Sequence, residues 1–320
     1  MIRTSLVIAV YNEINYIQKT LESVVGDADE IILADNASTD GTSDICQSFA
    51  NRYPEIKYTR HKENMGMAYN GSFAVEKASG KYIRFIGAHD MVSIGSTRNM
   101  ADILDKNPDA VMAFPKYIIS LNPNYSFKFF QAFEEYAKDL SSESALIRAK
   151  SITKNCFTHS SISFGLFRAE VLRKAHRTRV SNYNTDGAFI HLTAIAGKML
   201  ADEKSIFFRM WPERDCNTLE RWKKMYVKDK ADMSDFVLPF GNIAQVLDIT
   251  LEHFRSNREF CEYVLLTWLL KCGIPSNSNF RLKLQDIPNI VPGKENFASN
   301  LMDIMNEYYA SQPNNASILV

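Results

Sequence analysis

The stretch EIILADNASTDGT, residues 30–42, decides the fold of this 320-residue chain. Its first part, Glu30–Asp35, is an apolar run that predicts a strand buried on both faces, and the polar residues after it open a helix. An earlier run, Thr4–Val10 (TSLVIAV), has the same character, and apolar residues follow it at helical spacing. A strand, a helix and a second strand in this order predict parallel strands joined by a helical crossover.

The alternation continues through the first third of the chain. Further strands are expected at residues 56–60, 82–86 and 110–114, with helices at residues 66–78 and around Met100. We therefore predict an α/β fold, with a mostly parallel, doubly wound sheet and helices on both of its faces.

The remaining two-thirds has a weaker pattern. Residues 115–155 are rich in aromatic side chains and indicate a looser excursion or flap, whereas residues 184–200 predict a helix and residues 205–210 a strand. Beyond about Cys216 almost all signals are helical, so we expect a helical C-terminal extension. The apolar segment at residues 260–275 is too short to span a bilayer and predicts a core helix, with an interfacial helix as the alternative.

Composition excludes several classes of function. Lys and Arg number 37, as do Asp and Glu, so no general attraction to nucleic acid or to an anionic membrane is expected. The five cysteines have no metal-ligand spacing, and an odd, scattered set indicates reduced thiols in a cytosolic setting. The first residues lack a long apolar core, so a secretory peptide is not expected.

Polar residues stand at the ends of three predicted strands. They are Tyr11-Asn12-Glu13, Asp35-Asn36 and His89-Asp90. In open parallel sheets, ligands bind beyond the carboxyl ends of the strands, where the strand order reverses. The sequence therefore predicts one binding crevice built from residues far apart in the chain.

A family resemblance rests on the order of five motifs: VIAVYNE, ADNASTDGT, ENMG, GKYIRFIGAHD and NTD. In that order and spacing they resemble glycosyltransferase family 2, which comprises inverting enzymes of the GT-A fold that use nucleotide-sugar donors. The resemblance covers roughly the first two-thirds of the chain. It implies a GT-A domain, while the helical last third resembles no family that we can name.

By this resemblance, Asp35 accepts a hydrogen bond from the nucleotide base, usually from uracil N3–H, because a carboxylate can only accept. Asn36 replaces the second acid of the family signature. For the loop after the first strand the alternative is an ordinary turn in which Asn12 caps the next helix. The residues expected to bind the nucleotide-sugar are Val10, Tyr11, Glu13, Asp35, Asn64, Gly66, Ala88 and Arg209.

The cation site departs from the family pattern. The family has Asp-x-Asp where this chain has Gly87-Ala88-His89, followed by Asp90, and Trp211 stands where a later metal-binding His is common. Imidazole binds Mn²⁺ acceptably and Mg²⁺ poorly. We thus expect one of two outcomes. Either His89 and Asp90 form a metal site that has fewer ligands and prefers Mn²⁺, or the enzyme depends less on a metal ion. The alternative is a capping Asp beside a packed His.

Asp186, in the motif NTDG, matches the acid that serves the family as general base. It would take a proton from the acceptor hydroxyl as that oxygen attacks the anomeric carbon opposite the diphosphate. The alternative is that Asp186 only caps a helix. For His159, acceptor binding and a buried structural role fit the sequence equally well.

We therefore predict an inverting glycosyltransferase of surface polysaccharide synthesis. It would move a sugar, most often from a UDP-sugar, to a hydroxyl of a glycan or lipid-linked acceptor. Residues 1–115 would bind the donor, 116–215 would bind the acceptor and 216–320 would form the extension. A cytoplasmic location is expected, with peripheral contact at the inner face of the membrane left open. The alternative is a non-catalytic subunit that binds sugar nucleotides through a degenerate metal site.

Overall fold

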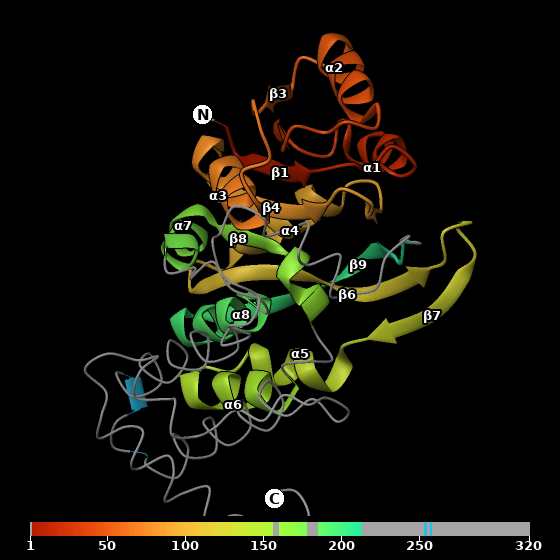
Figure 1. Ribbon diagram of the computed structural model, residues 1–320. Coiled ribbons are helices and arrows are strands. Elements are labelled where there is room, and N and C mark those ends of the chain that lie inside the picture. Colours follow the sequence, from red (N-terminus) through yellow and green to blue (C-terminus); the bar gives the residue numbers. More distant parts are fainter. Residues whose placement is uncertain (1, 156–159, 178–184, 213–252, 255–256, 258–320) are drawn as a thin grey trace, which may run out of the picture. The chain divides into compact units, whose positions relative to one another are not determined.

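The computed structural model describes residues 2–155, 160–177, 185–212, 253–254 and 257 (Figure 1). By its internal contacts the chain forms two compact units. The first contains residues 1–181 and 189–234, and the second contains residues 182–188 and 235–320. Almost all described residues belong to the first unit, so the predicted helical extension from residue 216 onward lies outside the described part except for residues 253, 254 and 257.

Four parallel strands form one half of a nine-stranded sheet, in the order β3-β2-β1-β4. They are β1 (Thr4–Val10), β2 (Glu30–Asp35), β3 (Ile56–Arg60) and β4 (Tyr82–Gly87). Every residue of β2 is buried, as expected for an apolar strand covered on both faces. The predicted strands of this half, and their parallel arrangement, are confirmed.

The second half of the sheet is mixed and continues from β4 in the order β8-β6-β9-β5, with β7 paired to β6. Its strands are β5 (Met91–Val92), β6 (Ala110–Leu121), β7 (Phe127–Ala132), β8 (Leu166–Arg168) and β9 (Lys198–Met210). The long strands β6 and β9 are parallel to each other, whereas β8 is antiparallel to both of its neighbours. As a result β1, β2, β4, β6 and β9 all end at the same edge of the sheet.

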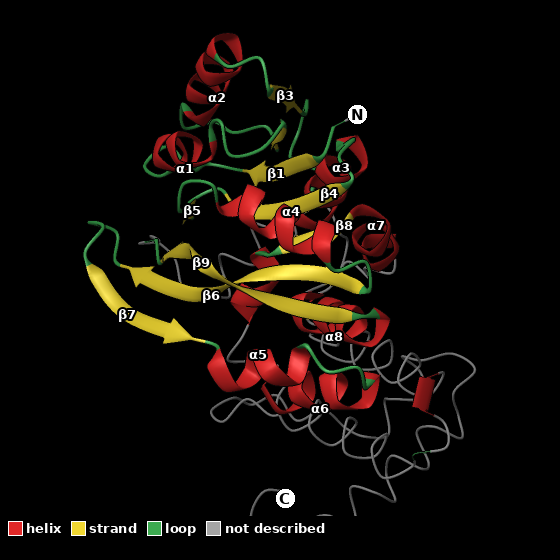
Figure 2. Cartoon of the chain, turned by 180° about the vertical axis from the view of Figure 1, so that it is seen from behind, coloured by secondary structure: helices red, strands yellow, loops and turns green. Residues whose placement is uncertain are grey.

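Helices cover both faces of this sheet. In Figure 1, α3 and α7 lie in front of the strands, and in the reverse view of Figure 2 α4 lies in front. The helices are α1 (Ile17–Val24), α2 (Thr42–Arg52), α3 (Met67–Lys77), α4 (Ser96–Lys106), α5 (Glu134–Leu140), α6 (Ala145–Asn155), α7 (Ala169–Arg177) and α8 (Thr185–Ala196), with a short 3-10 helix η1 (Ser160–Phe164). The predicted α/β architecture with helices on both faces is confirmed.

Two local predictions were wrong. Residues 115–155 are not a loose flap, because β6 runs on to Leu121, pairs with β7 and is followed by α5 and α6. The helix expected to reach residue 200 ends at Ala196, because β9 already begins at Lys198. Gly197 lies between them, where a Cβ would lie 3.1 Å from the carbonyl oxygen of Asp109. This close approach favours glycine at the junction.

A buried arginine ties the sheet to α4. Arg84 of β4 is fully buried, and its guanidinium donates to the Ser96 and Thr97 hydroxyls at 2.9 and 3.1 Å and to the Phe164 carbonyl oxygen at 2.9 Å. Burial lowers the pKa of Arg84 to about 10, while the charge of Asp27 opposes that change. The side chain therefore stays charged and holds the first turn of α4 against the sheet.

His191 makes the stability of the fold sensitive to acid. It is fully buried in α8, and burial lowers its pKa from 6.5 to about 3. The unfolded chain therefore binds a proton below pH 6.5 that the folded chain does not, so the free energy of unfolding must fall as the pH drops. We expect this group alone to remove about 1 kcal/mol between pH 7 and pH 5.5, measured by urea unfolding.

The variant His191→Leu isolates this effect, because leucine is similar in size to histidine but cannot bind a proton. The wild type and the variant should differ in the slope of unfolding free energy against pH, with the shallower acid loss in the variant. Equal slopes would contradict the assignment.

Candidate functional site

The carboxyl ends of four strands are joined in two pairs by direct hydrogen bonds at one edge of the sheet. The backbone N–H of Asn36, after β2, donates to the Val10 carbonyl oxygen at the end of β1 at 2.9 Å. The backbone N–H of Met210, at the end of β9, donates to Oδ1 of Asp90, after β4, at 2.9 Å. Residues far apart in sequence therefore meet where the sequence predicted a crevice.

Asp35 organises the β2 end of this edge. Its carboxylate is fully buried and accepts four hydrogen bonds: from the backbone N–H and hydroxyl of Ser38 at 2.9 and 2.6 Å, from Ser43 at 2.9 Å and from Tyr58 at 2.8 Å. A carboxylate has about four acceptor sites, so protein donors occupy them all. Asp35 thus holds the loop between β2 and α2, and its contact with a nucleobase stays a prediction.

Two residues of β3 complete this network and were not singled out from the sequence. Burial raises the pKa of Tyr58, and its hydrogen bond to Asp35 raises that pKa further. The Tyr58 hydroxyl therefore keeps its proton and acts as a donor. Arg60 donates to the Ser38 carbonyl oxygen at 2.8 Å and to the Ser43 hydroxyl at 3.1 Å. Tyr58 and Arg60 are two positions apart on a strand and therefore share a face, which was the only sequence signal for them.

The loop after β1 is hydrogen-bonded to the loop after β2. The backbone N–H of Asn12 donates to the Ser38 hydroxyl at 3.0 Å, and the Asn12 side-chain oxygen accepts from the N–H of Thr39 at 2.8 Å. The N–H of Glu13 donates to the Thr42 hydroxyl at 2.9 Å. The alternative role of Asn12 as a helix cap is wrong, because α1 begins only at Ile17.

The expected nucleotide residues in these loops differ in exposure. Val10 and Ala88 are buried, so their side chains support the loops, while Tyr11 is half-buried. Asn64 and Gly66, before α3, are joined to the β2 end through Asn36, whose amide donates to the Asn64 side-chain oxygen at 2.7 Å. The structure thus brings the β1, β2 and Asn64–Gly66 segments together, and their contact with a nucleotide stays a prediction.

His89, Asp90 and Glu13 cluster beside the β4 end. Nδ1 of His89 lies 3.2 Å from a carboxylate oxygen of Glu13. Asp90 is only 2% exposed, and burial raises its pKa, while the nearby charges of His89 and Arg209 oppose that rise. A Cβ on Gly87 would clash with Oδ2 of Asp90. The Asp90 carboxylate therefore fills the space in which an acid at position 87 would begin.

These residues fit a divalent cation only in part. Within the described residues, no group of three or more His, Cys, Asp or Glu side chains is arranged to hold a metal ion. His89 has a suitable arrangement, because Glu13 engages Nδ1 and so orients the ring with Nε2 as the ligand atom. Asp90, by contrast, is almost fully buried and accepts from a backbone N–H.

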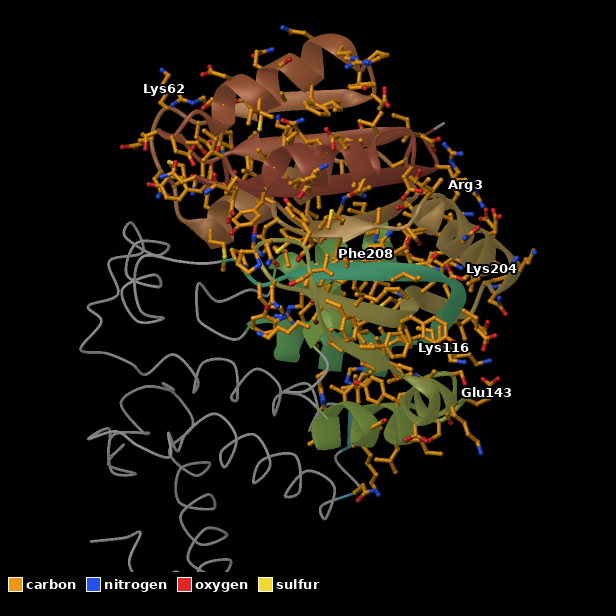
Figure 3. All side chains as sticks on the ribbon, turned by 90° about the vertical axis from the view of Figure 1, so that its right-hand side faces the viewer. Arg3, Lys62, Lys116, Glu143, Lys204 and Phe208 are labelled. Carbon is orange, nitrogen blue, oxygen red and sulfur yellow. The ribbon has the colours of Figure 1, made fainter. Side chains whose placement is uncertain are left out.

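The end of β9 carries positive charge beside Trp211. The ring of Trp211 has the guanidinium of Arg209 at 4.7 Å from its centroid and the ammonium of Lys128, from β7, at 4.5 Å. The charge of Arg209 also lies close enough to oppose the rise in the pKa of Asp90 that burial causes. The neighbouring residue Phe208 (labelled in Figure 3) packs in an apolar cluster with Leu121 and Met210. The predicted site residue Arg209 therefore lies at this edge of the sheet.

Asp186 lies in the first turn of α8, as expected for the acid of the NTDG motif. Its role as general base stays a prediction. His159 lies outside the described residues. Of the cysteines, Cys46 is a free, buried thiol, as expected for a small apolar side chain.

Ala37 is strained within the loop that Asp35 holds. It has φ +63°, a left-handed conformation that costs a residue with a Cβ about 1 kcal/mol or more. We expect Ala37→Gly to raise the free energy of unfolding by up to about 1 kcal/mol in urea titrations. As a control, Ala34→Gly, in the buried strand β2, should lower it, and a loss of stability in both variants would contradict the strain.

Comparisons with known proteins agree with this geometry. The family model "Glycosyl transferase family 2" matches residues 5–172. The Bacillus subtilis minor teichoic acid biosynthesis protein GgaB is 28% identical over 118 residues, which cover 35% of this chain and 13% of GgaB. The B. subtilis putative teichuronic acid biosynthesis glycosyltransferase TuaG is 35% identical over 89 residues, which cover 27% of this chain and 35% of TuaG.

Solved structures share the fold at low sequence identity. The Staphylococcus aureus protein TarS, residues 1–349 in complex with UDP, superposes with a TM-score of 0.57 at 14% identity, covering 97% of this chain and 92% of the TarS fragment. GalNAc-T7 with UDP, GalNAc and Mn²⁺ superposes with a TM-score of 0.52 at 14% identity, covering 79% of this chain and 55% of that one. The chain spans only 13% of GgaB and 35% of TuaG. The family match covers more than half of the 320 residues, and the chain therefore belongs to glycosyl transferase family 2.

Proposed function

We propose that this enzyme transfers a sugar from a UDP-sugar, with inversion, to a hydroxyl of a glycan or lipid-linked acceptor in surface polysaccharide synthesis. The observation that carries the proposal is the hydrogen-bonded meeting of the β1, β2, β4 and β9 ends at one edge. That edge presents acceptors and donors from loops, which suit a nucleotide, beside the guanidinium of Arg209, which suits a diphosphate. Complexes of TarS and GalNAc-T7 with UDP support uracil as the nucleobase of the donor.

The residues divide by chemistry. The loops carrying Tyr11, Asp35 and Asn64 would position the nucleoside, and Arg209 would offset charge on the leaving diphosphate. Asp186 would accept the proton of the attacking hydroxyl, so that the new bond forms as the bond to the diphosphate breaks. Residues 1–115 would thus bind the donor, 116–215 would bind the acceptor, and 216–320 would form the extension.

For the cation we propose a preference for Mn²⁺ over Mg²⁺, or a weak metal dependence. His89, through Nε2, and Asp90 would hold the ion, and a nitrogen ligand suits Mn²⁺ better than Mg²⁺. When bound, such an ion offsets charge on the donor diphosphate. The charge of Arg209 nearby supports a smaller contribution from the metal than an Asp-x-Asp site would require.

The reactants also set the location that we propose. A nucleotide-sugar donor and a lipid-linked acceptor meet at the cytoplasmic face of a membrane, so the enzyme would act in the cytoplasm with peripheral contact there. None of the described helices has both the length and the apolar character that crossing a bilayer requires.

Asp186→Asn tests the general base. The variant should retain binding of UDP, measured by thermal shift, but lose sugar transfer by about 10²–10⁴-fold, because the amide cannot take the proton. Asp44→Asn is the matched control, since Asp44 also lies in the first turn of a helix, α2. Near-normal turnover in Asp186→Asn would remove the assignment.

His89→Ala tests the cation preference. In calorimetric titrations with UDP, the wild type should gain more affinity from Mn²⁺ than from Mg²⁺, and the variant should lose that difference because the imidazole ligand is gone. An unchanged Mn²⁺ effect in the variant, or a stronger effect of Mg²⁺ in the wild type, would contradict the proposal.

A further inference from the structure

The hairpin of β6 and β7 leaves two large aromatic side chains open to solvent. Phe127 is 63% exposed and Phe130 is 54% exposed, although both lie within the sheet. In Figures 1 and 2 this hairpin projects beyond the neighbouring strands, on the side where β6 ends. Large apolar side chains exposed together on a folded protein indicate a surface that meets a partner.

A β-bulge places the two aromatic rings on one face of the hairpin. The pairing of β7 with β6 skips Lys128, which is therefore the extra residue of the bulge. Phe127 lies opposite Leu121, and on the other side of the bulge Phe130 lies opposite Ile119. Because Ile119 and Leu121 are two positions apart on β6, they share a face, and the rings opposite them share it too.

This face continues an apolar cluster of the sheet. Leu121 and Ile119 pack with Phe208 and other apolar side chains at the end of β9. Further out, the ring of Phe130 stacks on Tyr117, with 5.7 Å between the ring centroids. The apolar face therefore runs from the interior of the sheet out to the open side of β7.

Positive charge lies beside the exposed rings. The ammonium of Lys128 is 4.5 Å from the ring centroid of Trp211, which is 39% exposed, and it has no carboxylate partner in the described part of the chain. Residues 110–133, which contain the whole hairpin, include no Asp or Glu. Since the chain as a whole carries no net charge, attraction to an anionic surface must come from local groups such as these.

We propose that the hairpin surface, defined as Phe127, Phe130, Lys128 and Trp211, docks on the surface of an anionic lipid bilayer. Aromatic rings are favoured at the level of the lipid headgroups, where an apolar body and a polar neighbourhood are both satisfied. A lysine beside them pairs with anionic headgroups. The combination of open rings with an unpaired ammonium is therefore complementary to such a membrane in both apolarity and charge.

The position of the hairpin surface gives docking a consequence for the site. The backbone N–H of Trp211 donates to the Leu121 carbonyl oxygen at 3.0 Å, so the ends of β9 and β6 are joined where the hairpin begins. Docking through this hairpin would bring the edge of the sheet that carries the candidate site close to the membrane. That benefit rests on the proposed function, in which the acceptor is lipid-linked, whereas the binding to a bilayer does not.

A second copy of this chain is the other occupant that the hairpin surface could take. Within the described part of the chain β7 pairs only with β6, so its outer edge could accept a further strand. The bulge and the lysine at position 128 oppose this, because both are devices by which edge strands avoid pairing with another chain. A bilayer needs no matching strand, so the same features leave membrane docking unaffected.

Flotation of the full chain with lipid vesicles tests the proposal. The wild type should bind vesicles of phosphatidylcholine mixed with phosphatidylglycerol more tightly than vesicles of phosphatidylcholine alone. Phe127→Ser should weaken binding to the mixed vesicles at least several-fold, because the ring no longer enters the headgroup layer. Lys128→Gln should weaken it about fivefold and leave binding to phosphatidylcholine unchanged, because only the charge interaction is lost.

Two variants elsewhere on the described surface serve as matched controls. Ile147→Ser removes a 45% exposed apolar side chain from α6, and Lys106→Gln removes an exposed charge from the end of α4. Both should bind vesicles as the wild type does. Binding that weakens equally in the controls, or that survives unchanged in both hairpin variants, would overturn the proposal. If Phe127→Ser fails to fold, the comparison of Lys128→Gln with Lys106→Gln still decides it.

The remaining outcomes separate this inference from the proposed function. A wild type that binds UDP but neither kind of vesicle would overturn the inference alone. A wild type that docks through the hairpin surface but binds no UDP would contradict the proposed function and leave the surface standing. Sedimentation velocity without vesicles tests the second copy: a dimer that Phe127→Ser dissociates would overturn the membrane assignment.

Discussion

The buried carboxylate of Asp35 is the constraint on which the site depends. A charged group without contact with water is tolerated only where protein donors replace its hydration, and here four do so. Those donors come from the loop after β2, from α2 and from β3. Once they are in place, Ser38 and Thr39 are positioned to bind the backbone and side chain of Asn12.

This constraint holds the loops at the β2 end of the site to one another. The β1 loop is attached to the β2 loop, and the Asn64–Gly66 segment is attached to Asn36. Preorganised polar groups bind a ligand without the cost of ordering themselves. The strain at Ala37 is consistent with this, since a loop held by so many bonds can keep one residue in an unfavourable conformation.

The β4 end of the site departs from the family pattern in a coherent way. With glycine at position 87, the Asp90 carboxylate can turn inward and bind the N–H of Met210. His89 then pairs with Glu13, and Arg209 brings a fixed positive charge near Asp90. Each change alone would leave a charge or a space uncompensated. Together they place an imidazole and a guanidinium at the edge where the family pattern has carboxylates.

The sequence by itself determined the strands β1 to β4, the helices between them and the family, because these depend on local patterns: apolar runs, helical spacing, polar turns and motif order. It also placed Glu13, Asp35, His89 and Asp90 at one edge, since parallel strands end together. Only the tertiary structure decided that β6 pairs with β7, that Tyr58 and Arg60 serve Asp35, that Asp90 turns inward and how the Asn36 amide faces. Those outcomes depend on contacts between residues distant in the chain, which no local pattern encodes.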